Sequence, residues 1–261
     1  MGLNMELIQE EYPSNPLELE IFQNWLAILN RAQIPYVLGG AFAVYLHGGG
    51  WRDTKDMDVF LQPKDLKRAL GLFNEAGYKT EVRAANWLAK VSHGAYFADL
   101  IFGFWNGRLK SIHNWIERSQ PAQFLGIWVP LISLEDLIYS KLYLAARDRF
   151  DGGDIVHLIG KADREIDWKV VLDQLGDDFA LLLWHLIFYD YVYPGLVRRG
   201  EREVIEGLFE RIRKNWSGAD GNPYFRGPLV DPFFFKMDME EMGYPDPRDL
   251  TPLVDQEGNL L

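Results

Sequence analysis

The stretch from Tyr36 to Leu61, YVLGGAFAVYLHGGGWRDTKDMDVFL, constrains the fold more than any other part of the chain. A short apolar strand runs into Gly39 and Gly40. A helical run, a glycine-rich turn and an alternating strand that contains Asp56 and Asp58 follow. A strand, a helix and a second strand so close together predict a compact unit of mixed α and β structure.

The patterns around this stretch divide the chain into two parts. Strand-like and helical runs alternate up to about residue 130, and helical runs dominate after it. We therefore expect an α+β fold, in which a small mixed β-sheet with flanking helices is followed by a C-terminal helical domain. The expected domains are 1–132, with its core at 36–104, and 133–261, with an irregular tail at 217–261 packed by aromatic residues such as Phe233 to Phe235. Expected helices are 16–34, 64–78, 133–150, 152–162, 167–176, 177–193 and 202–216, and further expected strands are 78–83, 86–93, 95–104 and 124–133.

The composition favours a cytoplasmic protein without a membrane partner. No apolar run reaches the ~18 residues of a membrane helix, and the first residues lack the basic and apolar regions of a secretory signal. The absence of cysteine excludes disulfides and thiolate metal sites, and the five histidines lack metal-ligand spacing. The net charge of −11 disfavours an extended nucleic-acid groove. A protein this acidic needs metal ions to hold a polyphosphate.

Three aspartates form the candidate chemical site. Asp56 and Asp58 are two positions apart on one strand, so both side chains point to the same face and repel each other unless a cation lies between them. Asp99 interrupts the apolar run YFADLIF, where a charge requires a partner or a metal. Taken singly, the aspartate pair reads more simply as a solvated strand end, and the pair Gly39 and Gly40 as a tight turn.

Together these residues resemble the nucleotidyltransferase superfamily typified by DNA polymerase β. That family combines a glycine pair, a carboxylate–x–carboxylate strand and a third carboxylate on a neighbouring strand. The form of the motif is most similar to that of the abortive-infection-toxin-type nucleotidyltransferases and the related antibiotic nucleotidyltransferases. Arg52 and Thr54 also match the motif of the toxin-type proteins. The resemblance implies that Gly39, Gly40, Arg52 and Thr54 bind the nucleotide.

A second stretch, SLEDLIYSKLYLAARDRFDGGDIVHL, resembles the segment that follows the catalytic sheet in those relatives. The resemblance implies that Lys141 contacts the triphosphate and that Asp154 orients Lys141 or Arg147. It leaves open whether Asp151 or Asp154 takes the site role. Ordinary salt bridges between helices are the simpler alternative for Asp154.

The resemblance implies an enzyme that transfers a nucleotidyl group. Asp56, Asp58 and Asp99 would bind one or two Mg²⁺, and a nucleoside triphosphate such as ATP would donate its nucleotidyl group to a hydroxyl with release of pyrophosphate. The acceptor is open between a small molecule, a tRNA end and a protein side chain. An antitoxin partner is a further implication, and the oligomeric state stays open. The alternative function is a non-catalytic nucleotide sensor that retains the same fold.

Overall fold

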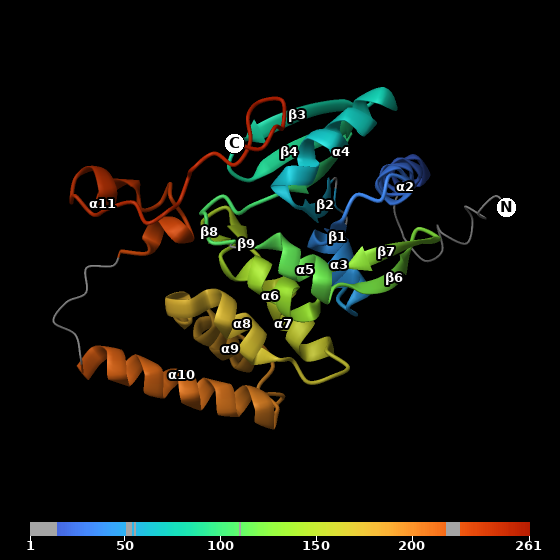
Figure 1. Cartoon of the computed structure of the whole chain (residues 1–261). Helices are drawn as coiled ribbons and strands as arrows, with labels where there is room; N and C mark the ends of the chain where they lie inside the picture. Colours follow the sequence, from blue (N-terminus) through green and yellow to red (C-terminus); the bar gives the residue numbers. More distant parts are fainter. Residues whose placement is uncertain (1–14, 51–53, 55, 110, 218–224) are drawn as a thin grey trace. The chain divides into compact units, whose positions relative to one another are not determined.

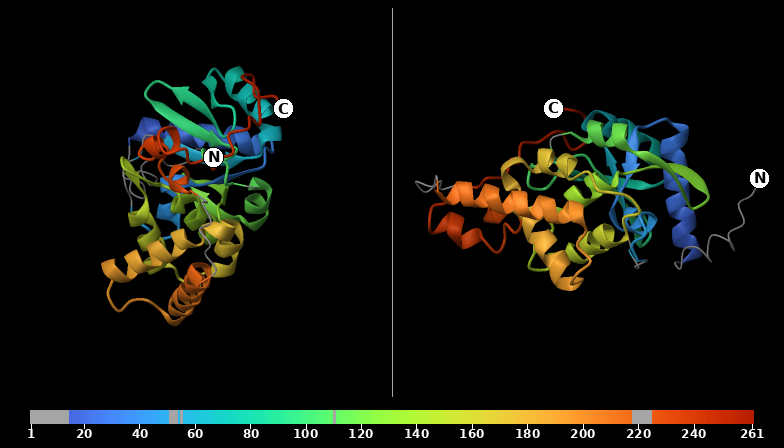
Figure 2. Two further views of the ribbon diagram at one scale, coloured as in Figure 1. Left: turned by 90° about the vertical axis from the view of Figure 1, so that its left-hand side faces the viewer. Right: turned by 90° about the horizontal axis from the view of Figure 1, so that it is seen from below.

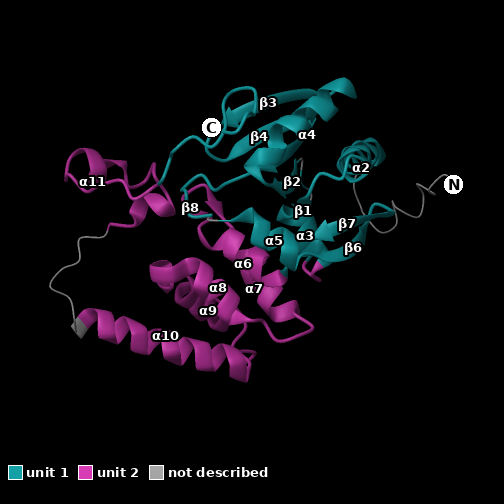
Figure 3. Cartoon of the chain, viewed as in Figure 1, with its two compact units in different colours: residues 1–46, 50–133, 249–261 teal, residues 47–49, 134–248 magenta. Residues whose placement is uncertain are grey.

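The computed structural model describes residues 15–50, 54, 56–109, 111–217 and 225–261 (Figure 1). The chain divides into two compact units (Figure 3). Unit 1 comprises residues 1–46, 50–133 and 249–261, and unit 2 comprises residues 47–49 and 134–248. Across the described ranges, no helix combines the length and the apolar character needed to span a membrane.

Unit 1 is built on a seven-stranded mixed sheet with the strand order β3-β4-β5-β2-β1-β7-β6. The pairs β1–β7 and β2–β5 are parallel, and the other four pairs are antiparallel. The α+β fold expected from the sequence is therefore confirmed. The strands are β1 (Tyr36–Leu38), β2 (Asp56–Leu61), β3 (Lys79–Ala84), β4 (Leu88–His93), β5 (Tyr96–Ile101), β6 (Gln120–Phe124) and β7 (Ile127–Leu131), and the helices are α2 (Pro16–Arg31), α3 (Gly40–Leu46), α4 (Pro63–Glu75) and α5 (Ile112–Arg118).

The first helix follows its sequence signals. Asn15 caps α2, because its side chain accepts a hydrogen bond of 2.9 Å from the Leu17 N–H, and Pro16 occupies the first turn. The apolar residues of α2 at helical spacing, Leu19, Phe22, Leu26 and Leu29, are buried. The helix packs against one face of the sheet, where the centroid of the Phe22 ring is 6.5 Å from that of Tyr96 on β5 and 5.6 Å from that of Phe42 on α3. Helices α2 and α4 also contact each other (Figure 2).

The opposite face of the sheet carries Asp56 and Asp58, and it is only partly covered. Trp115 of α5 packs edge-on against Phe60 of β2, with ring centroids 5.1 Å apart. Phe60 follows Asp58 by two positions, so both side chains lie on this face. Helix α5 thus covers the end of the strand beyond the aspartates.

Two expected elements were wrong. The run 124–133 was expected to be one strand, but it contains the turn of the β6–β7 hairpin, where Leu125 and Gly126 take φ values of 50° and 72°. The helix expected over 133–150 ends at Leu142, and a short hairpin of β8 (Ala145–Ala146) and β9 (Arg149–Phe150) follows it. Both errors arose because apolar content alone does not report a turn.

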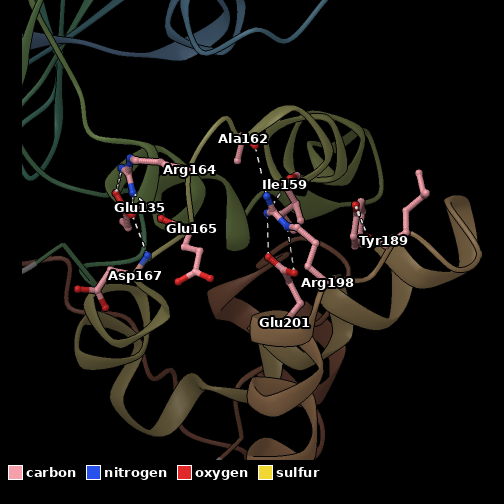
Figure 4. A network of polar contacts seen from close by, with 10 residues as sticks. Glu135, Ile159, Ala162, Arg164, Glu165, Asp167, Tyr189, Arg198 and Glu201 are labelled. Atoms are coloured by element: carbon pink, nitrogen blue, oxygen red, sulfur yellow. Dashed lines mark hydrogen bonds and ion pairs between the residues drawn. The ribbon is translucent and has the colours of Figure 1, made fainter.

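In the part of unit 2 that the structure describes, the regular secondary structure is helical apart from that hairpin. Two buried carboxylates tie its segments together (Figure 4). Glu135 accepts hydrogen bonds of 2.6 and 2.7 Å from Arg164, and Glu201 accepts 2.8 Å from Arg198. The helices are α6 (Leu134–Leu142), α7 (Gly152–Lys161), α8 (Trp168–Leu175), α9 (Ala180–Val192), α10 (Arg199–Ser217) and α11 (Lys236–Glu240).

The last part of the chain differs from the expected irregular tail packed by aromatics. Phe233 and Phe234 are 70% and 62% exposed, although Phe235 packs edge-on against Phe225. Residues 249–261 belong to unit 1, where the Leu253 N–H donates a hydrogen bond of 2.8 Å to the carbonyl of Ala85.

Candidate active site

The glycine pair stands against the aspartate strand. The Gly39 N–H donates a hydrogen bond of 2.9 Å to the Asp58 carbonyl, and Gly40 has a φ of 60°. A Cβ atom at Gly40 would lie 1.8 Å from Asp58 Oδ2, and one at Gly39 would lie 2.4 Å from the Phe60 ring. Both positions therefore require glycine, for backbone conformation at Gly40 and for space at both. The pair is more than a tight turn, because it brings bare backbone to the Asp58 carboxylate.

The third aspartate lies beside the second. Strands β2 and β5 are parallel, and their register places Asp58 opposite Asp99. Directly opposite residues point to the same face, so Asp56, Asp58 and Asp99 share the partly open face of the sheet. The side chain of Asp56 accepts a hydrogen bond from the Thr54 hydroxyl. Thr54 therefore positions a carboxylate, whereas Arg52 lies outside the described residues.

Asp99 has a cationic partner that the sequence analysis missed. Lys90 of β4 lies opposite Asp99, and its Nζ is 2.7 Å from Asp99 Oδ1. The same amine lies 3.9 Å from the centroid of the Phe97 ring. A signal was present in the sequence, because two neighbouring apolar strands are each interrupted by one charge, of opposite sign.

The donor set suits a magnesium ion. Within the described residues, no three His, Asp or Glu side chains are grouped closely enough to hold a metal. Mg²⁺, however, is commonly bound by one or two carboxylates together with the phosphates of its substrate, and carboxylate oxygens are its preferred ligands. Asp58 and Asp99, opposite each other on one face, meet that smaller requirement.

Lys141 lies in unit 2 and is 2% exposed. Its Nζ is 2.8 Å from Asp151 Oδ2 and 2.7 Å from Asp154 Oδ2. The expected contact between Asp154 and Lys141 is therefore present, and Asp151 makes an equivalent one. Burial raises the pKa of Asp151, but the charge and hydrogen bond of Lys141, helped by Arg149, outweigh it and leave that pKa below its usual value. The triphosphate contact of Lys141 stays a prediction, and its observed ion pairs favour a positioning role.

Replacing Gly40 with alanine is expected to destabilise unit 1 and weaken nucleotide binding. The positive φ alone costs about 1–2 kcal/mol for an alanine, and the new methyl group must also displace the Asp58 carboxylate. Gly71→Ala is the control, because Gly71 lies inside α4 with open space around it, and alanine there is expected to stabilise the helix. Urea unfolding and calorimetric titration with ATP measure both effects. Equal stability and equal ATP affinity of Gly40→Ala and the wild type would refute this role of Gly40.

Comparisons with known proteins place the chain in a family. Residues 19–186 match the model of the family described as "Nucleotidyltransferase of unknown function (DUF6036)". No curated protein matches the chain. Several solved structures, among them the following three, are similar to it. The antibiotic-resistance factor ANT(2″)-Ia is 14% identical over 76% of this chain and 100% of its own, with a TM-score of 0.44.

The other two are the lincosamide antibiotic adenylyltransferase LnuA and a putative nucleotidyltransferase from Thermotoga maritima. LnuA is 20% identical over 54% of this chain and 96% of its own, with a TM-score of 0.41. The Thermotoga maritima protein is 14% identical over 52% of this chain and 89% of its own, with a TM-score of 0.43. The family model spans well over half of the chain and includes all three aspartates and the glycine pair. The chain belongs to this family of nucleotidyltransferases.

Proposed function

We propose that the chain is a Mg²⁺-dependent enzyme that transfers a nucleoside monophosphate from a nucleoside triphosphate to a hydroxyl group. The observation that carries the proposal is the register of β2 and β5, which pairs Asp58 with Asp99, together with the backbone of Gly40 against Asp58. A purely structural pair of aspartates has no need for a glycine held at this distance.

Asp58 and Asp99 are the residues that would hold the metal together with the phosphates, and Asp56 would add a carboxylate on the same face of β2. When bound, Mg²⁺ neutralises charge on the triphosphate, which an acidic chain otherwise repels. Gly39 and Gly40 offer backbone without side chains, which lets phosphate oxygens approach the strand end. The Thr54 hydroxyl fixes the Asp56 carboxylate, and Lys90 fixes that of Asp99.

In the proposed reaction the acceptor oxygen forms a bond to the α-phosphorus. The bond between the α-phosphorus and the oxygen that bridges to the β-phosphate breaks, and pyrophosphate leaves with the electron pair. The proton of the acceptor hydroxyl passes to the Asp99 carboxylate. Positioning and charge neutralisation supply most of the rate enhancement in such phosphoryl chemistry.

Label transfer tests the proposal. The protein is incubated with each α-³²P-labelled nucleoside triphosphate, Mg²⁺ and separate pools of small hydroxyl compounds, tRNA and protein. We expect label in one pool with stoichiometric pyrophosphate, and loss of both with EDTA. Transfer that survives EDTA would exclude the metal requirement. ATP binding by calorimetry without transfer to any pool would favour the nucleotide sensor instead. The antitoxin partner and the cytoplasmic location stay predictions.

A further inference from the structure

The face of the sheet that carries the aspartates extends into a hollow of about 220 Å³ over β3, β4 and β5. Half of its lining residues are cationic. Its volume is smaller than that of sites for drug-sized molecules, so it suits a single group of a ligand. It is lined by Lys79, Glu81, Arg83, Lys90, Ser92 and Phe97, and we call it the cationic hollow.

Strand register connects the cationic hollow to the aspartates. One row of directly paired residues runs from Asp58 through Asp99 and Lys90 to Glu81. A second, parallel row runs from Asp56 through Phe97 and Ser92 to Lys79. Adjacent strands are about 4.8 Å apart, so Lys79 is roughly 14 Å from Asp56 along its row. A ligand with one group in the hollow can therefore place a second group, about 10 Å from the first, at the aspartates.

The hollow is on the opposite side of Asp58 from the glycine pair. In the strand order β3-β4-β5-β2-β1, the glycines follow β1, whereas the hollow lies over β3 to β5. If the triphosphate lies beside Gly39 and Gly40, the hollow is on the side left for the acceptor.

The charge of the hollow is opposite to that of the whole protein. Its lining has three cationic side chains and one carboxylate in a chain with a net charge of −11, and Lys90 is already paired with Asp99. Lys79 and Arg83 are therefore the two cationic side chains that the hollow offers to a ligand. Arg83 Nε is 3.3 Å from Glu81 Oε2, but both side chains are about half exposed, and such a surface pair is weak. An incoming anion can replace it. Lys79 and Arg83 can then both contact a phosphate monoester, which is close to a dianion at neutral pH.

We propose that the cationic hollow binds the phosphate monoester group of a small acceptor, whose free hydroxyl then lies at Asp58 and Asp99. This inference rests on the proposed function, because it names the class of acceptor for that site. The charge of a monoester and the small volume favour a phosphorylated small molecule over a nucleic-acid backbone, whose phosphodiesters each carry one charge. Lys79 and Arg83 supply direct contacts, and Lys90 joins the hollow to Asp99.

The test uses inorganic phosphate as the probe and the full chain as the protein. Backbone amide shifts of Lys79, Arg83 and Lys90 are followed by NMR during titration, and the double variant K79Q/R83Q is compared with R31Q/K64Q. Arg31 and Lys64 are exposed residues of α2 and α4 outside the hollow, so the control removes the same charge. We expect shifts in the hollow, phosphate binding weakened roughly tenfold or more in K79Q/R83Q, and less than a twofold change in the control.

The remaining outcomes separate this inference from the proposed function. ATP affinity of K79Q/R83Q is expected to stay within about twofold of the wild type, since the triphosphate is held elsewhere. Phosphate shifts confined to the glycine pair, or no binding at all, would overturn the acceptor site whether or not transfer occurs. A short RNA without a terminal phosphate that binds the hollow more tightly than inorganic phosphate would overturn the monoester assignment.

Discussion

Asp58→Asn is expected to reduce nucleotidyl transfer by roughly 10³-fold or more while leaving the fold intact. The substitution keeps the shape of the side chain and removes its negative charge. Asp58 is opposite Asp99 and in contact with the Gly40 backbone, so it is the residue at which the proposed metal, the triphosphate and the third carboxylate converge. Removing its charge weakens the hold on the proposed metal most in the transition state, where charge develops on the transferred group.

Initial rates of label transfer at saturating nucleoside triphosphate measure this effect. Asp173→Asn is the matched control, because Asp173 is an exposed residue of α8 that pairs only at the surface with Lys169. We expect the control to retain wild-type activity, and both variants to unfold at the same urea concentration as the wild type within error. Transfer by Asp58→Asn within threefold of the wild type would remove Asp58 from the catalytic machinery.

The central part of the fold could be predicted because its sequence signals are local. Asn15 and Pro16 mark the start of α2, and the strand that contains Asp56 and Asp58 alternates from Asp56 to Val59. Each of these patterns is set by neighbours within a few residues. Helices α7 to α10 of unit 2 could also be predicted from the sequence, since their apolar residues repeat at helical spacing.

The partners within the site could not be predicted, because they depend on strand order and register. The sequence shows one charge in each of the two apolar strands, but the contact of Lys90 with Asp99 requires β4 and β5 to be antiparallel neighbours with this register. The steric demand at Gly40 is likewise invisible until β1 and β2 are paired. Pairing between strands decides which charges meet, and one residue of slip would move Lys90 to the other face.

The β8–β9 hairpin is a different kind of error. The residues from Ser133 to Phe150 contain no proline or glycine, so nothing in the pattern interrupts the expected helix. The structure ends α6 after Lys141 and Leu142, and the hairpin returns the chain to Asp151. This reversal of the chain brings Asp151 and Asp154 to Lys141. The ion pairs of Lys141 therefore depend on a helix end that local propensity does not predict.

Lys141→Met is expected to lower the free energy of unfolding of unit 2 by about 3–5 kcal/mol. Methionine fills a similar volume but leaves the buried Asp151 and the partly buried Asp154 without their shared cation, and an uncompensated buried charge is costly. Lys169→Met is the control, because Lys169 is 79% exposed and its pair with Asp173 is solvated. We expect that variant to change stability by less than about 0.5 kcal/mol. Urea unfolding followed by circular dichroism compares the three proteins.

The pH dependence of the stability lost in Lys141→Met shows whether the loss comes from the missing charge or from altered packing. In the wild type the pKa of Asp151 is below its usual value of 3.8, so the stability contributed by its ionised form is complete above pH 3.8 and is lost as the pH falls through the lower folded-state pKa. Without Lys141, burial acts on Asp151 with only Arg149 to oppose it, and protonation then relieves the cost of burying the carboxylate. The difference in stability between the wild type and Lys141→Met should therefore be largest near pH 7 and shrink as the pH approaches 3.8. Adding Asp151→Asn to Lys141→Met should recover part of the loss at pH 7 for the same reason. A loss that is independent of pH and is not relieved by Asp151→Asn would mean that Lys141 stabilises unit 2 by packing alone.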